Sequence, residues 1–174
     1  VGLAPSVVQV IADTLFDAAV LLRNSADVRE NHTVGVDAPP EPVWYEADES
    51  QIRQIVWNLA TNGLRAMGEG GTVTLAANHP QREPGKADTI ALAVTDEGIG
   101  IDPDDIDGIL QPFHGGFARG TGLGLSIVHR IVSDYGGELV MTSARGKGTT
   151  VTVKLPAVEA KTESLKSDVG SLKS

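Results

Sequence analysis

The spacing of hydrophobic residues predicts three helices in this chain. Apolar side chains recur every three or four positions from about Pro5 to Arg23, which is typical of an amphipathic helix. The same spacing follows Asp48, a suitable N-cap, and Gln51 three residues later completes the pattern of a capping box. A third apolar segment, from about Gly122 to Tyr135, ends at two glycines that suit a left-handed C-cap.

Shorter segments have the alternating or β-branched composition of β-strands. Because strands and helices do not alternate strictly, a doubly wound parallel sheet is a poor fit. We expect instead a two-layer α/β sandwich, in which a mixed, mainly antiparallel sheet carries helices on one face. The expected strands are His32–Val36, Pro42–Glu46, Thr72–Asn78, Thr89–Thr95, and a final hairpin formed by Glu138–Ser143 and Thr149–Leu155.

One main domain is expected at residues 31–156, because 174 residues with 41% hydrophobic content suit a single core. Residues 1–30 are expected to form an N-terminal helix and a junction leading into that domain. Residues 157–174 are polar and without periodicity, which is typical of a disordered tail. Ile101–Arg119 is rich in Asp, Gly and Pro, and a segment of this length within a small domain is usually functional or mobile.

Composition excludes several classes of function. The chain has 14 basic and 23 acidic residues, for a formal charge of −9, so a broad nucleic-acid surface is not expected. It has no cysteine, which excludes disulfides, thiolate metal sites and cysteine nucleophiles. No apolar run approaches the roughly 20 residues that span a bilayer, and no signal peptide opens the chain. We therefore expect a cytoplasmic protein, or a cytoplasmic fragment of a parent that could itself be membrane-anchored.

Two asparagines at helical spacing are the first candidate site. Asn58, Asn62 and Arg65 fall within about 60° of one another on an ideal helix, beside the apolar stripe. An amide oxygen is a hard, neutral ligand that suits Mg²⁺. For the helix alone, two solvated asparagines are the simpler interpretation, but the glycine-rich segments that follow favour a binding site.

An acidic loop with two glycines follows the strand that leads to Asp96. A carboxylate there can accept a hydrogen bond from an exocyclic amino group, which adenine offers and the corresponding edge of guanine does not. Gly98 and Gly100 would let the backbone approach a base without a Cβ clash. The alternatives are an ordinary acidic turn and a calcium loop, and the second is disfavoured because both glycines fall where calcium ligands are required.

A second glycine-rich loop, Gly120–Ser126, opens the third helix. Exposed backbone N–H groups at a helix N-terminus form a cradle for anions, which an acidic domain needs if it binds a nucleotide. The spacing fits neither a dinucleotide fingerprint nor a Walker loop. By itself the loop could equally be a tight turn that packs a helix on a sheet. After the other two motifs, a phosphate loop is the better interpretation.

Taken in order, these motifs resemble the ATP-binding catalytic domain of bacterial sensor histidine kinases, which has the Bergerat fold. The resemblance covers roughly Val43 to Leu155. The matching runs are ESQIRQIVWNLATNGLRAM for the N box, DEGIGI for the G1 box, QPF for the F box, GTGLGLSIV for the G2 box and GKGT for the last glycine box. For the last run, a plain hairpin turn is an equally good interpretation. The resemblance implies that Ile101–Arg119 is a flexible lid over ATP.

The resemblance also implies site residues, with ATP and Mg²⁺ as cofactors. It assigns the Mg²⁺ ligand to Asn62 and adenine selectivity to Asp96. Catalytic support is expected from Asn58, Arg65 and Arg119. The residues implied to bind the nucleotide are Asn58, Asn62, Asp96, Gly98, Gly100, Ile101, Gly120, Thr121, Gly122, Leu123, Gly124, Leu125 and Thr149.

The residue four positions before the metal asparagine bears on the reaction. Hydrolytic relatives of the gyrase and MutL types have a glutamate there that activates water, whereas this chain has Asn58. An amide cannot act as a general base near neutral pH, so transfer of phosphate to an external acceptor is favoured over hydrolysis. The resemblance implies that the acceptor is a histidine on a separate dimerisation domain, with the receiver domain of a response regulator downstream.

None of the four histidines has the histidine–acidic–proline context of the family's phosphorylation site, so we interpret the chain as a catalytic fragment that is itself monomeric. The lid also departs from the family. Phe117 stands where a lysine is common, which leaves Arg119 as the nearest cation and predicts weak nucleotide affinity or a lid ordered only by the partner domain. Two alternatives remain open on the same fold: an anti-sigma-type serine kinase, and a nucleotide-binding interaction module without transferase activity.

Overall fold

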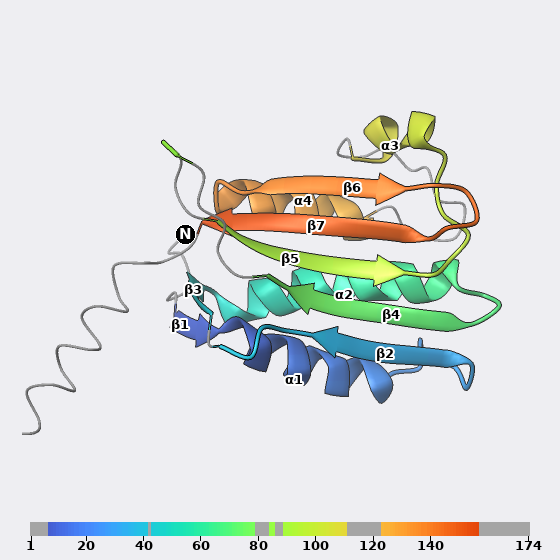
Figure 1. The fold of residues 1–174 in the computed structure, drawn as a ribbon, viewed down its shortest axis with the longest axis horizontal. Coiled ribbons are helices and arrows are strands. Elements are labelled where there is room, and N and C mark those ends of the chain that lie inside the picture. Colours follow the sequence, from blue (N-terminus) through green and yellow to red (C-terminus); the bar gives the residue numbers. More distant parts are fainter. Residues whose placement is uncertain (1–6, 42, 79–83, 86–88, 111–122, 157–174) are drawn as a thin grey trace, which may run out of the picture.

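The computed structural model describes residues 7–41, 43–78, 84–85, 89–110 and 123–156. Five strands form the main sheet, in the order β2 (His32–Asp37), β4 (Gly71–Ala77), β5 (Thr89–Asp96), β7 (Thr149–Pro156) and β6 (Glu138–Ser143) (Figure 1). β2 and β4 are parallel, and the other neighbouring strands are antiparallel. The predicted mixed, mainly antiparallel sheet is confirmed.

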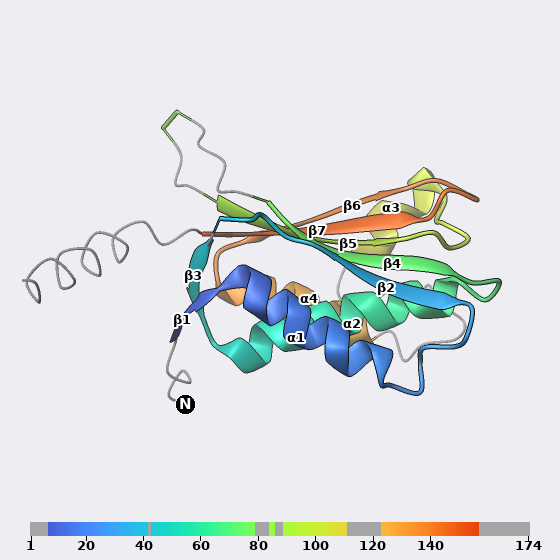
Figure 2. The same cartoon turned by 60° about the horizontal axis from the view of Figure 1, so that its bottom comes forward.

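Helices cover one face of this sheet. α1 (Ile11–Arg23), α2 (Glu49–Ala66) and α4 (Leu123–Asp134) form a layer against it, while α3 (Pro103–Leu110) packs beside β6 (Figure 2). A separate two-stranded sheet, β1 (Val7–Val10) with β3 (Trp44–Ala47), lies at one end of the helical layer. This is the two-layer arrangement that the sequence predicts. Within the described residues, no helix is long and apolar enough to cross a membrane.

The core lies between the sheet and this helical layer and is made mostly of aliphatic side chains. β5 alternates between buried and half-buried residues, so that Ile90, Leu92 and Val94 are all buried. Each such side chain stabilises the fold by about 1.5–3 kcal/mol. The opposite face of the sheet carries small and polar side chains, among them Thr95 and Thr150, whose hydroxyl oxygens are 3.0 Å apart.

The first predicted helix begins later than its hydrophobic spacing indicates. It starts at Ile11 rather than near Pro5, because Val7–Val10 pairs antiparallel with β3. The backbone N–H of Ile11 then donates to the carbonyl of Val43, at 2.9 Å. Valine is β-branched and favours extended backbone when a partner strand is present, so pairing with β3 outweighs the local helical pattern.

The predicted lid segment also contains regular structure that the sequence analysis did not anticipate. Residues 103–110 form α3, and the Asp102 carboxylate caps its first turn by accepting the backbone N–H of Asp104 at 3.0 Å. Proline is well suited to the first helical position, since its missing N–H would have no partner there. The remainder of the predicted lid, residues 111–119, lies outside the described residues.

The predicted N-cap of α2 is confirmed, but its capping box is completed by a third residue. Asp48 accepts the backbone N–H of Ser50 at 2.9 Å. Gln51 does not reach back to the N–H of Asp48, because the hydroxyl of Tyr135 stands between them. That hydroxyl accepts from the Asp48 N–H at 2.9 Å and donates to Gln51 Oε1 at 2.7 Å. The start of α2 is therefore tied to the end of α4.

The predicted glycine cap of α4 is confirmed. Gly136 has φ +67°, and its N–H donates to the carbonyl of Ser133 at 2.9 Å. The N–H of Gly137 donates to the carbonyl of Val132, also at 2.9 Å. This pair of hydrogen bonds is the Schellman motif, which requires a residue in the left-handed region. It fixes the chain direction just after Tyr135.

We expect Tyr135→Phe to lower the free energy of unfolding by about 1 kcal/mol, because the substitution removes both hydrogen bonds but keeps the ring. Urea unfolding measures this loss. A double-mutant cycle with Gln51→Ala tests the contact itself: the two losses should not add, since both variants break the same bond. Fully additive losses would contradict the bridge.

Candidate functional site

Asp96 is a buried carboxyl group at the end of β5. The residue is 9% exposed, and Oδ1 accepts the backbone N–H of Gly98 at 2.9 Å. The backbone N–H of Thr149, the residue paired with it on β7, also hydrogen-bonds to this carboxyl. Burial raises the pKa of Asp96 above its ordinary value, and these two hydrogen bonds partly offset that effect. Because burying a carboxyl group destabilises the fold, a buried carboxyl such as this one is a candidate functional residue.

The two glycines after Asp96 are required by the packing of the protein itself. A Cβ on Gly98 would lie 2.7 Å from the carbonyl oxygen of Ala66, at the end of α2. Gly100 has φ +71°, and a Cβ there would overlap the carbonyl oxygen of Ala144 in the β6–β7 turn. The loop is thus held between α2 and the last hairpin. The predicted role of both glycines, to admit a base, stays a prediction.

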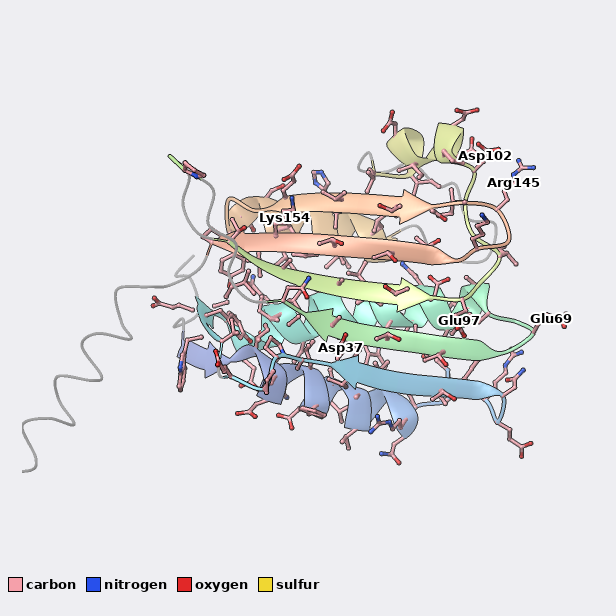
Figure 3. All side chains as sticks on the ribbon, in the orientation of Figure 1. Asp37, Glu69, Glu97, Asp102, Arg145 and Lys154 are labelled. Carbon is pink, nitrogen blue, oxygen red and sulfur yellow. The ribbon has the colours of Figure 1, made fainter. Side chains whose placement is uncertain are left out.

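The neighbouring carboxylate, Glu97, points elsewhere. Its Oε2 accepts the backbone N–H of Thr72 at 2.7 Å, at the start of β4, and its own N–H approaches the sulfur of Met67 at 3.3 Å. Figure 3 shows Glu97 at the end of β5, beside β4. Two adjacent acidic residues therefore have separate tasks: Glu97 joins two strands at the surface, and Asp96 is left facing the interior beside α2.

The asparagines of α2 lie against the first turn of α4. Asn58 Nδ2 donates to the carbonyl of Gly124 at 3.3 Å. A Cβ on Gly124 would lie 3.9 Å from both amide atoms of Asn62, so a side chain at position 124 would touch that amide. Asn58 is half-buried and Asn62 is exposed. The structure thus brings together the predicted metal ligand and the start of the predicted phosphate-binding helix.

Asp96 also lies against this part of α2, next to Gly63, the residue that follows Asn62. A Cβ on Gly63 would lie 3.0 Å from Asp96 Cβ and 3.3 Å from its Oδ2. The absence of a side chain at Gly63 is what lets the Asp96 carboxyl sit directly against α2. The asparagines, the buried carboxyl and the N-terminal end of α4 therefore all meet around the second half of α2. No pattern in the sequence singled out Gly63 for this role.

The remaining predicted residues take varied positions. The guanidinium of Arg65 lies 3.9 Å from the carboxylate of Asp27, between α1 and β2. Leu125 packs against the core. Ile101 and Thr149 both contact Ser143, a residue that sequence reasoning missed. Arg119, Gly120, Thr121 and Gly122 lie outside the described residues, as does the side chain of Leu123.

The described residues contain no group of three or more histidine, cysteine, aspartate or glutamate side chains that could hold a metal ion. The described side chains therefore do not suit a cation that is held by protein ligands alone. They suit an Mg²⁺ ion that keeps several waters and takes most of its other ligands from a bound phosphate group. For such an ion, one exposed amide oxygen such as that of Asn62 is a sufficient protein ligand.

Comparison with known proteins identifies the family. Residues 47–159 match the family of histidine kinase-, DNA gyrase B- and HSP90-like ATPases. The chain belongs to this family. The predicted resemblance is confirmed, and the asparagines of α2, Asp96 and the start of α4 all lie within the matched residues.

Curated relatives that are named as histidine kinases match most of the chain. The domain is 39% identical over 145 residues to the histidine protein kinase DivJ of Caulobacter vibrioides, which covers 80% of this chain and 23% of DivJ. It is 37% identical over 133 residues to the sensor histidine kinase ZraS of Escherichia coli, which covers 76% of this chain and 26% of ZraS. The chain spans about a quarter of the length of these relatives.

Solved structures confirm the fold. The catalytic domain of the histidine kinase ThkA superposes with a TM-score of 0.74 at 24% identity, covering 88% of this chain and 97% of that one. Full-length ShkA in complex with AMPPNP gives a TM-score of 0.72 at 29% identity, covering 92% of this chain and 32% of that one. The ATPase domain therefore has the Bergerat-type α/β sandwich that the sequence predicts.

The β6–β7 turn offers a matched pair of glycine substitutions. Gly146 and Gly148 both have positive φ, so alanine costs about 1–2 kcal/mol at either position. A Cβ on Gly146 meets nothing within 4 Å, whereas one on Gly148 would overlap the carbonyl of Asp96. We expect Gly148→Ala to lower the free energy of unfolding by about 1–3 kcal/mol more than Gly146→Ala, measured by urea unfolding. Equal losses would show that the turn does not support Asp96.

The burial of Asp96 predicts a pH dependence of stability. Its pKa in the folded state lies above the ordinary value of 3.8, so the folded state holds the proton over a wider pH range. The resulting stabilisation is fully present below the unfolded pKa and is lost as pH rises through the folded pKa. Asp96→Asn removes this titration, so the free energy of unfolding should fall less with rising pH in the variant.

Urea unfolding of the wild-type protein and of Asp96→Asn, repeated from about pH 4 to pH 7, measures this difference. Asp37→Asn is the control, because that carboxyl is exposed at the end of β2. Parallel pH profiles for the wild type and Asp96→Asn would contradict the assignment of a destabilising buried carboxyl.

Proposed function

We propose that this ATPase domain binds MgATP and transfers the γ-phosphate to a histidine on a separate dimerisation domain of a sensor kinase, which would pass the phosphate to the receiver domain of a response regulator. The observation that supports this function best is the convergence around α2 of a buried carboxyl, two amides and the start of α4. The curated relatives named above are histidine kinases, which favours histidine over serine as the acceptor.

Asp96 is the residue proposed to recognise adenine. An ionised carboxylate only accepts hydrogen bonds, so it would bind the exocyclic amino group of adenine. Guanine has a carbonyl oxygen at the corresponding position, which would place two acceptors together and leave both without a donor. Such a mismatch inside a buried site typically costs several kcal/mol. ShkA, which has the same fold, is in complex with AMPPNP, an adenine nucleotide analogue.

Asn62 is the proposed Mg²⁺ ligand, and the bound ion would neutralise charge on the transferring phosphate. Asn58 stands where a hydrolytic enzyme needs a general base. Its amide cannot take a proton from water, and its Nδ2 is already used to hold the carbonyl of Gly124. Asn58 would therefore position the start of α4, whose backbone N–H groups would face the phosphates. This arrangement favours transfer to an imidazole nitrogen over hydrolysis.

Titration calorimetry with MgATP, MgGTP and metal-free ATP tests the binding step. We expect MgATP to bind tightest, and Asn62→Ala to weaken MgATP binding by about tenfold, or roughly 1.4 kcal/mol, while metal-free ATP is little affected. Asn24→Ala, an exposed amide at the end of α1, is the matched control. Equal affinity for MgATP and MgGTP would refute the role of Asp96.

Transfer itself is tested by adding the dimerisation domain of the parent kinase to this domain with γ-labelled ATP. Acid-labile, base-stable phosphate on that domain is the expected product. Tight MgATP binding without any labelled histidine would favour the alternative, a nucleotide-binding interaction module.

A further inference from the structure

The last residue of β6, Ser143, is a hydrogen-bonding centre between two segments of the proposed nucleotide site. Its hydroxyl oxygen accepts the backbone N–H of Ile101 at 2.7 Å. The hydroxyl proton is donated to the carbonyl of Gly148 at 2.9 Å. The Thr149 hydroxyl lies 2.8 Å from the same oxygen.

These three contacts use the whole capacity of one hydroxyl group, which has one proton to donate and two lone pairs. Since the Ser143 proton goes to Gly148, the Thr149 hydroxyl must donate its own proton to Ser143. The rotamer of Thr149 is then fixed, and its oxygen can act toward any other group only as an acceptor. The backbone N–H of Thr149 meanwhile holds the carboxyl of Asp96.

Other contacts between the same segments are weaker or less specific. Arg145 and Asp102 form an ion pair at 3.2 Å, but the Arg145 side chain is 79% exposed, and such pairs contribute about 0–1 kcal/mol (Figure 3). The N–H of Gly146 donates to the carbonyl of Ile99 at 2.7 Å, which depends on the turn backbone and on no side chain. Ser143 is the side chain that joins the turn to both Ile101 and Thr149.

We propose that Ser143 is a positioning residue of the nucleotide site: its hydroxyl fixes Ile101 and Thr149, and thereby sets the affinity for adenine nucleotides without touching them. This proposal rests on the proposed function. In Ser143→Ala, the N–H of Ile101 and the carbonyl of Gly148 lose their partner and the Thr149 hydroxyl can rotate. The loop after Asp96 then has no side-chain tie to the β6–β7 turn at Ile101.

Titration calorimetry with MgATP and MgGTP tests the proposal at a temperature where circular dichroism shows each variant to be folded. We expect Ser143→Ala to weaken MgATP binding by about tenfold and to reduce the preference for MgATP over MgGTP. Ser143→Thr keeps the hydroxyl and should restore both quantities. If the alanine variant does not fold, Ser143→Cys, which keeps the side-chain size, takes its place.

Thr150→Val is the matched control, because it removes a hydroxyl contact between β5 and β7, from the residue next to Thr149 but on the opposite face of the sheet. It should leave both affinities within about twofold of the wild type. Arg145→Ala should do the same, since it breaks only the exposed ion pair. Hydrogen exchange at the Ile101 N–H provides a second readout and should quicken in Ser143→Ala alone.

The proposed function and the role of Ser143 can be refuted separately. A wild-type domain that does not bind MgATP refutes the proposed function. A wild-type domain that binds MgATP selectively, with Ser143→Ala unchanged in affinity and selectivity, refutes the role of Ser143 alone. Weaker binding that Ser143→Thr does not restore also refutes it, because the loss would then not depend on the hydroxyl.

Discussion

The burial of one carboxyl group, that of Asp96, is the constraint on which the site depends. A carboxylate taken out of water destabilises the fold unless polar groups compensate for it, and here two backbone N–H groups do so in part. One comes from its own loop and the other from β7. The helix beside it must also come close, which Gly63 permits because it has no side chain. Sheet, loop and helix are thus fixed relative to one another by the need to enclose a single acidic group.

The β6–β7 turn has a larger part than its position at the surface indicates. Its backbone meets the loop after β5 at two glycines, Gly100 and Gly148, each so close that a Cβ would overlap a carbonyl oxygen. Ser143, the residue of β6 just before this turn, adds a side-chain hydrogen bond to Ile101. A hairpin turn and a ligand-binding motif were equally good interpretations of GKGT in the sequence. The structure shows that this segment forms the hairpin turn and supports the loop that begins at Asp96; contact with a nucleotide stays a prediction.

α2 combines two tasks through the spacing of its residues. Its buried residues pack on the sheet. Asn58 and Asn62 lie at the edge of this buried face, next to the start of α4. At its other end, α4 returns to the beginning of α2 through Tyr135. α4 is therefore tied to α2 at both of its own ends, which keeps its N-terminus beside the two amides. Under the proposed function, this arrangement would let an acidic domain hold the phosphates of a nucleotide without a basic cleft.

The sequence by itself determined what depends on neighbouring residues. Hydrophobic spacing, the Asp48 cap and the glycines after Tyr135 predicted α2, α4 and the last hairpin, because caps and periodicity act within a few residues. Only the tertiary structure decided the rest. Val7–Val10 forms a strand because it pairs with β3. The capping box of α2 is completed by Tyr135, which lies 87 positions from Asp48. The sequence could not show whether Gly98 makes room for a ligand or for the nearby carbonyl of Ala66. A glycine indicates that space is needed at its position, but not which group occupies that space.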